Sequence, residues 1–177
     1  MHFDHVRVPR TMLVGELNAG WRVIMGAIDV ERASFSSPGL PKRQLDLLLA
    51  YANEQQHGVR PVDDPLVQDR LVRLAIEVES AHLMSYWVAS LYDQGRMPQH
   101  ETSLNALVKR ETARRLDIAG LEMLGPYGPL REGSAWTPVD GLVEHDYREH
   151  IYFQFAAGGF DITRNVIAGR GLGLPRG

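Results

Sequence analysis

Apolar residues recur every three or four positions through most of the chain, which is the period of an α-helix. In residues 18–35 this pattern places Trp21, Ile24 and Ile28 on one helical face, with Asn18 as the predicted N-cap. The stretch SSPGLP that follows contains two prolines and a glycine, so it should kink or end this helix.

Five further helices are predicted from the same pattern. Asp64 and Pro65 form a favourable N-cap and first-turn pair for the third helix, which should end near Gly95. Its predicted core positions are Val67, Leu71, Leu74, Val78, Ala81 and Val88. The other helices are expected over residues 41–55, 101–124, 138–151 and 160–168. Long helices with short connections indicate an all-α, up-down four-helix-bundle-like domain.

The first residues have a different pattern. Phe3, Val6 and Val8 lie on a short extended run that Pro9 ends, which predicts one β-strand. No other strand is expected after it, so this strand is either a stub or part of a sheet formed elsewhere. We divide the chain into a strand and linker segment, residues 1–15, and a helical bundle, residues 16–177.

Composition narrows the function classes. The 177 residues are 44% hydrophobic, enough for a core, and the formal net charge of −3 argues against a polybasic nucleic-acid binder. The absence of cysteine excludes disulfides, thiolate metal sites and a cysteine nucleophile. No apolar run has the length of a membrane span, and the N-terminus lacks a signal-peptide pattern. The expectation is a cytoplasmic domain.

The local pattern that most suggests chemistry is DVER, from Asp29 to Arg32. Glu31 follows Ile24 and Ile28 on the apolar face of its helix. A carboxylate in apolar surroundings loses solvation and becomes a better proton acceptor, so Glu31 is a candidate general base. Asp29 and Arg32 can pair on the neighbouring face. The alternative is an ordinary charged helix turn at the rim of the core.

Two glycine corners are also candidates. Gly158 and Gly159 precede a predicted helix, whose free N–H groups favour an anion or a polar ligand edge. The other corner, LGPYGP from Leu124 to Pro129, follows a helix and is typical of a C-cap. In both cases a tight turn without function remains the alternative.

Three patterns rich in histidine or arginine carry weaker signals. The pairs Glu54–His57 and Glu79–His82 have the Glu-x-x-His spacing of a di-iron four-helix bundle, although bridging glutamates are not evident. The segment KRETARR lacks interleaved aromatic residues, so we expect an exposed helix face and no nucleic-acid site. HDYREH, residues 145–150, is likewise expected to be a solvated helix.

Taken together, three ordered motifs resemble the C-terminal half of the acyl-CoA dehydrogenase family. FDHVRVPRTMLVGELNAGWRVIM is similar to the family's last β-domain strand and its turn into the first bundle helix. ARRLDIAGLEMLGPYGPL resembles the helix and glycine turn that meet the flavin, and GGFDITRNVIAGRGLGLPR resembles the closing signature. The resemblance runs over nearly the whole chain. It implies that residues 1–15 are a remnant of a β domain that is absent here.

The resemblance implies FAD-dependent α,β-dehydrogenation of an acyl-CoA thioester, with electrons passed to electron-transfer flavoprotein or another acceptor. Most members carry the base at the position of Ala157, which cannot accept a proton. Another branch carries it at the position of Glu31, with Asp29 and Arg32 contacting the pantetheine arm. The residues implied at the cofactor are Glu122, Gly125, Gly158, Gly159, Phe160 and Asp161.

Two departures from the family pattern bear on the flavin. Glu54 and His57 stand where members have an arginine, which reaches the FAD diphosphate of a neighbouring subunit, and a phenylalanine. Gly159 replaces the usual threonine. Such patterns resemble branches that form mixed-subunit tetramers with fewer flavins than chains. Alongside the enzyme domain, the sequence therefore leaves open a non-catalytic, flavin-poor partner or scaffold subunit and the di-iron bundle, and the chain is expected in a homo- or hetero-oligomer.

Overall fold

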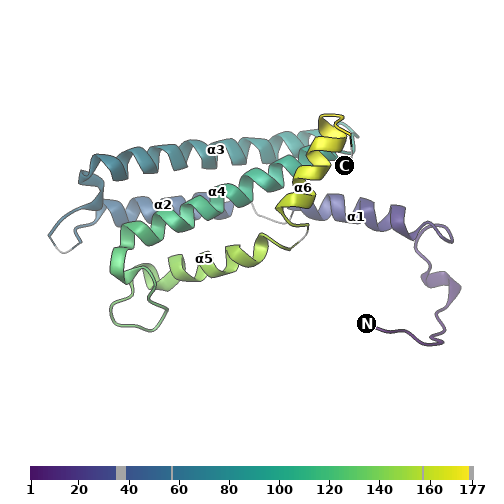
Figure 1. Cartoon of the computed structure of the whole chain (residues 1–177), viewed down its shortest axis with the longest axis horizontal. Helices are drawn as coiled ribbons and strands as arrows, with labels where there is room; N and C mark the ends of the chain where they lie inside the picture. Colours follow the sequence, from purple (N-terminus) through teal and green to yellow (C-terminus); the bar gives the residue numbers. More distant parts are fainter. Residues whose placement is uncertain (35–38, 57, 157, 176–177) are drawn as a thin grey trace.

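The structure, a computed structural model, describes residues 1–34, 39–56, 58–156 and 158–175. Most of this part of the chain is helical, and it contains no β-strand (Figure 1). The helices are α1 (Gly20–Ser34), α2 (Gly39–Asn53), α3 (Pro65–Asp93), α4 (His100–Leu124), α5 (Leu142–Phe153) and α6 (Phe160–Val166). Short 3-10 segments lie at Arg10–Met12, Pro61–Asp63, Gly125–Tyr127 and Pro138–Gly141, and a π-helical turn, Ile167–Gly171, follows α6.

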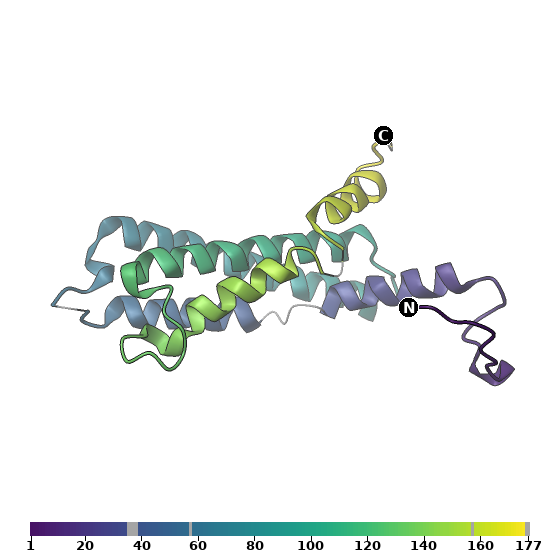
Figure 2. The ribbon, with the colours of Figure 1, turned by 60° about the horizontal axis from the view of Figure 1, so that its bottom comes forward.

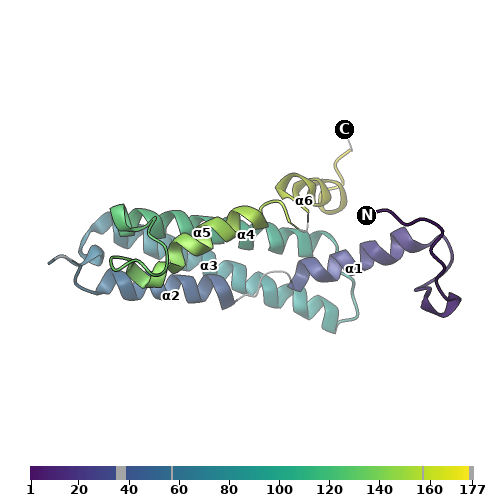
Figure 3. The same cartoon turned by 90° about the horizontal axis from the view of Figure 1, so that it is seen from below.

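Helices α2, α3, α4 and α5 run up and down beside one another, which confirms the predicted bundle (Figures 1 and 2). Helix α1 approaches the end of this bundle at which α2 begins, and α6 leaves it near the same end (Figure 3). Helix α4 is central because it contacts all five other helices. This position explains why α4 contains so many of the buried residues.

The hydrophobic core lies between α2, α3, α4 and α5. The predicted positions Leu71, Leu74 and Val78 of α3 are buried there against Leu48 of α2 and Leu116 of α4. The side chain of Asp64 accepts a hydrogen bond from the Leu66 amide at 2.8 Å, so the predicted N-cap of α3 is confirmed. The helical period therefore located the bundle and its core correctly.

The predicted strand at residues 3–8 is not formed. Phe3, Val6 and Val8 are all exposed, and a single extended segment has no neighbouring backbone to pair with. Asn18 is not the cap of α1, because the helix begins two residues later and Asn18 has a φ of 65°, a turn conformation. Within the described ranges, no helix combines the length and the apolar composition needed to cross a lipid bilayer.

The segment KRETARR does not form the exposed face that the sequence predicts. Lys109, Arg110 and Thr112 are buried, whereas Arg114 and Arg115 are exposed. The reason is the central position of α4, which has neighbouring helices on several sides. The polar residues of this segment therefore contribute to the interior of the molecule.

Candidate active site

The connection between α5 and α6 lies against α4 and is held there by Arg110. Its guanidinium donates from Nη1 to the carbonyl of Gly158 at 2.8 Å and from Nη2 to the carbonyl of Ala156 at 3.1 Å. Gly158 has a φ of 83°, a left-handed conformation that favours glycine, and Gly159 is the N-cap of α6. The predicted glycine corner is thus a defined turn fixed from α4, although Ala157 lies outside the described residues.

Contacts made by Thr163 and Arg164 also hold the start of α6. The hydroxyl of Thr163, which is buried, lies 3.1 Å from the carbonyl of Gly159. Arg164 forms an ion pair with Glu111 of α4 at 3.0 Å, and its guanidinium lies 5.5 Å from the ring centre of Phe160. Asp161 is exposed, 3.9 Å from Arg164. Gly159, Phe160 and Asp161 therefore form the start of a helix that is anchored to the bundle.

Glu31 lies near the C-terminal end of α1, and α1 also packs against α4. In all three views this end of α1 and the α5–α6 connection lie at the same end of the bundle (Figures 1–3). Glu31 is exposed and Ile24 is 49% exposed, so the described chain by itself does not provide the apolar surroundings that the sequence predicts. The side chains of Asp29 and Arg32 lie outside the described part of the structure. The proximity of Glu31 to Ala157 stays a prediction.

The other predicted cofactor residues lie elsewhere. Glu122 and Gly125 are at the C-terminal end of α4, about 18 Å and about 22 Å along the helix from Arg110 at 1.5 Å per residue. Gly125 is exposed with a φ of 55°, and nothing lies within 4 Å of a Cβ placed on it, so a ligand could approach this backbone closely. Glu122 forms an ion pair with Arg70 of α3. The predicted cofactor residues thus form two separate groups.

The Glu54 position does not fit a diphosphate. Glu54 is exposed immediately after α2, where its carboxylate would repel an anion, and His57 lies outside the described residues. The di-iron alternative also lacks support: among the described residues, no three His, Asp or Glu side chains are grouped so that they could hold a metal ion. His82 instead packs edge-on against Tyr86, with ring centres 4.8 Å apart.

Sequence reasoning missed a buried polar group between α2, α4 and α5. Asp117, almost fully buried, accepts from Gln44 Nε2 at 2.5 Å, and its other oxygen lies 2.7 Å from His150 Nδ1. Burial by itself lowers the pKa of His150, but the hydrogen bond and charge of Asp117, with Asp146 and Glu149, raise it above its ordinary value. HDYREH is therefore not a uniformly solvated helix.

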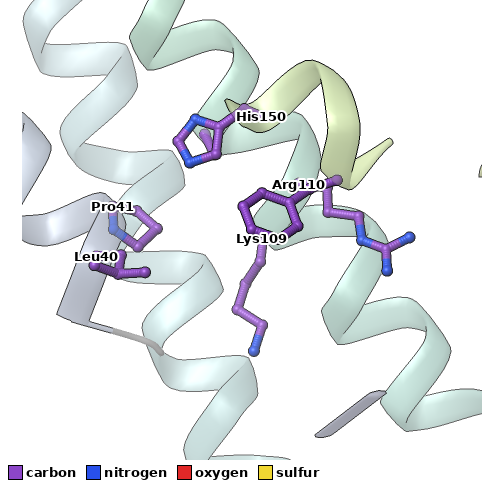
Figure 4. A pocket seen from close by; sticks show the side chains of 7 residues that line it. Leu40, Pro41, Lys109, Arg110 and His150 are labelled. Carbon is purple, nitrogen blue, oxygen red and sulfur yellow. The ribbon is translucent and has the colours of Figure 1, made fainter. Parts of the chain in front are cut away.

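A cavity of about 70 Å³ lies beside this group, bordered by Leu40, Pro41, Lys109, His150 and their neighbours. Figure 4 shows Lys109 extending from α4 between these side chains, with the guanidinium of Arg110 pointing away from Leu40 and Pro41. This space suits a few water molecules and is far below the volume of pockets that take a drug-sized ligand. An acyl-CoA thioester does not fit inside this cavity.

The ammonium group of Lys109, which borders the cavity, has a lowered pKa. The residue is 1% exposed, and burial, with the charge of Arg110, lowers the pKa of its ammonium group to about 8. Between pH 8 and the ordinary value of 10.5 the unfolded chain holds a proton that the folded chain has lost, so stability should rise with pH. We expect wild type to gain about 3 kcal/mol relative to Lys109→Met across this range.

Denaturant unfolding at a series of pH values measures this difference. Lys42, the only other lysine of the chain, is exposed, so Lys42→Met is the matched control and should show no such trend. Parallel pH profiles for wild type and Lys109→Met would contradict the expected titration.

Comparison with known proteins agrees with this architecture. Residues 18–172 match the family model described as acyl-CoA dehydrogenase, C-terminal domain. Glutaryl-CoA dehydrogenase of Desulfococcus multivorans is 27% identical over 180 residues, which cover 99% of this chain and 44% of that protein. The chain thus spans less than half the length of this curated relative.

Solved structures also match nearly the whole chain, and the chain again covers less than half of each matched protein chain. The ChsE4–ChsE5 complex from Mycobacterium tuberculosis matches with a TM-score of 0.85 and 30% identity over 99% of this chain and 45% of that chain. A variant of the Tcur3481–Tcur3483 steroid ACAD matches with a TM-score of 0.86 and 26% identity, covering 99% and 46%. The family model covers most of the chain. The chain therefore belongs to the acyl-CoA dehydrogenase family and corresponds to its C-terminal domain.

Proposed function

We propose that this chain is the C-terminal helical domain of an enzyme that dehydrogenates an acyl-CoA thioester between its α and β carbons. The observation that carries the proposal is the family match over residues 18–172. The arrangement of α1 and the α5–α6 connection, which both contact α4, supports it, because a base on α1 and a cofactor at the glycine corner would then face one substrate. The names of relatives, glutaryl-CoA dehydrogenase among them, support the thioester class.

In the proposed reaction the Glu31 carboxylate accepts the α-proton, and the electron pair of that C–H bond forms the new C=C bond. FAD, when bound, supplies the acceptor for the hydride that leaves the β-carbon. Asp29 and Arg32 would contact the pantetheine arm, and Gly158 and Gly159 the cofactor. The reduced enzyme would pass its electrons to electron-transfer flavoprotein or another acceptor.

The two cofactor groups suggest an oligomer. Glu122 and Gly125 lie far along α4 from the α5–α6 connection, so the two groups would contact distant parts of one cofactor or two cofactors in an assembly. The ChsE4–ChsE5 relative is a complex of two named chains, which supports a mixed assembly. The exposed Glu54 favours the second candidate function, a non-catalytic partner subunit that binds little flavin.

The test uses the protein purified in its native context, with everything that co-assembles with it. Short-chain, glutaryl and steroid side-chain acyl-CoA thioesters are added without oxygen while flavin absorbance is followed. We expect one thioester to bleach the flavin and to yield one enoyl-CoA per flavin reduced. The 177-residue chain alone should bind FAD weakly and turn over little. A flavin content of about one per two chains, with normal turnover, would favour the partner-subunit function, and bound iron without flavin would contradict both.

A further inference from the structure

We propose that Arg110 is a positioning residue, which sets the orientation of the peptide between Gly158 and Gly159 toward a bound ligand. The proposal deepens the proposed function, because that peptide lies at the corner where the cofactor would bind. Arg110 is 8% exposed and comes from α4, 48 positions before Gly158. It therefore joins the corner to the centre of the bundle.

The planar guanidinium of Arg110 contacts the connection at two points. Two nitrogens of one rigid planar group reach two carbonyls, those of Ala156 and Gly158, at 3.1 and 2.8 Å. Because the nitrogens are fixed relative to each other, both carbonyl oxygens are drawn toward the same side of the connection, the side of α4. A lysine could donate to one carbonyl but lacks the planar fork that holds both.

The contact to the Gly158 carbonyl also fixes the direction of the Gly159 N–H. The described peptide bonds include no cis bond, and in a trans peptide the C=O of one residue and the N–H of the next point in opposite directions. The Gly158 carbonyl points toward Arg110, so the Gly159 N–H points away from α4. Arg110 thus orients a backbone donor outward, on the side from which a ligand would approach.

The buried cation of Arg110 supplies hydrogen bonds to backbone that lies outside both flanking helices. Helix α5 ends at Phe153 and α6 begins at Phe160, so the carbonyls of Ala156 and Gly158 belong to the connection between the helices and need partners of their own. Hydrogen bonds from a charged donor are about twice as strong as neutral ones. Thr163 adds a neutral contact at 3.3 Å to the Gly158 carbonyl. Arg110 is therefore the stronger of the two restraints.

The first experiment needs no activity. Amide hydrogen exchange is compared between wild type, Arg110→Met and Arg114→Met. Arg114 lies one turn further along α4 and is exposed, so it is the matched control. We expect Arg110→Met to speed exchange about 10- to 100-fold over residues 158–163, including the Thr163 amide that bonds to Gly159, while the control stays at the wild-type rate. Unchanged exchange in Arg110→Met would overturn the proposal.

The second experiment uses the flavin-loaded enzyme. A misplaced cofactor contact should lower kcat about 10- to 100-fold with KM changed little, and Arg110→Lys should recover only part of the loss. Free guanidinium at millimolar concentration should restore activity to Arg110→Ala, which a general loss of folding would not allow. Failure of rescue together with full activity in Arg110→Lys would overturn the role of the fork. If wild type reduces no flavin, the proposed function fails, and the exchange experiment still decides the role of Arg110.

Discussion

Replacing Glu31 by glutamine should lower the rate of α,β-dehydrogenation by about 10²- to 10⁴-fold in the flavin-loaded enzyme, the usual contribution of a positioned general base. Glutamine has nearly the same shape as glutamate, but its amide cannot take up the α-proton. Flavin absorbance and content should be unchanged, because the proposed cofactor contacts do not include this side chain. Stopped-flow reduction of the flavin by the acyl-CoA thioester measures the chemical step directly.

The control for this change is Glu16→Gln. Glu16 is also an exposed carboxylate, in the segment that leads into α1, and it has no place in the proposed reaction. Its rate of flavin reduction should match wild type. Near-normal reduction in Glu31→Gln would move the base to another residue. A loss of flavin in the same variant would indicate that Glu31 supports the cofactor site and would leave the base assignment without support.

Glu31 is more exposed in the described chain than a general base should be during the reaction. A general base works best where water is excluded, yet the described chain leaves Glu31 and much of the apolar face of α1 open. Trp21, at the start of the same helix, is 78% exposed. Under the proposed function, α1 would have to be covered by other protein before Glu31 could act in apolar surroundings. The isolated chain should then lack the environment that the reaction requires.

The fold was predictable because its main signal is local. The apolar residues of α3 at helical spacing determine which face is buried, and Leu71, Leu74 and Val78 are in the core as expected. The cap at Asp64 depends on a contact two residues away in sequence, so it was also predictable. The strand at residues 3–8 failed for the complementary reason: a strand is stabilised by partners, and a sequence pattern cannot supply them.

The interior of the candidate site was not predictable, because it depends on distant pairs. Asp117 bonds to Gln44, 73 positions away, and to His150, 33 positions away, and no local pattern encodes either contact. Polar residues do recur at helical spacing along α4, as at Asn105, Lys109 and Thr112. That stripe is the available sequence signal, but an exposed helix face has the same pattern. Only the packing of five helices around α4 decides between the two.

Replacing Asp117 by alanine should lower the free energy of unfolding by about 3 to 5 kcal/mol, the cost of breaking a buried charged pair. The change removes the shared acceptor of Gln44, which is buried, and of His150, which is about four-fifths buried. Asp69→Ala is the matched control, since it removes the carboxylate of an exposed pair with Arg73 and should have little effect. Urea unfolding of the three proteins at pH 6 measures the difference.

The pH dependence separates the lost ion pair from a simple cavity. Asp117 helps raise the pKa of folded His150 above its ordinary 6.5, so the folded state holds a proton that the unfolded state releases as pH rises. The contribution of the pair is therefore fully present below about pH 6.5 and is lost as pH rises through the folded pKa. The stability difference between wild type and Asp117→Ala should shrink over that interval. A difference that stays constant with pH would mean that Asp117 stabilises the bundle only by packing and neutral hydrogen bonds, and would contradict the charged pair.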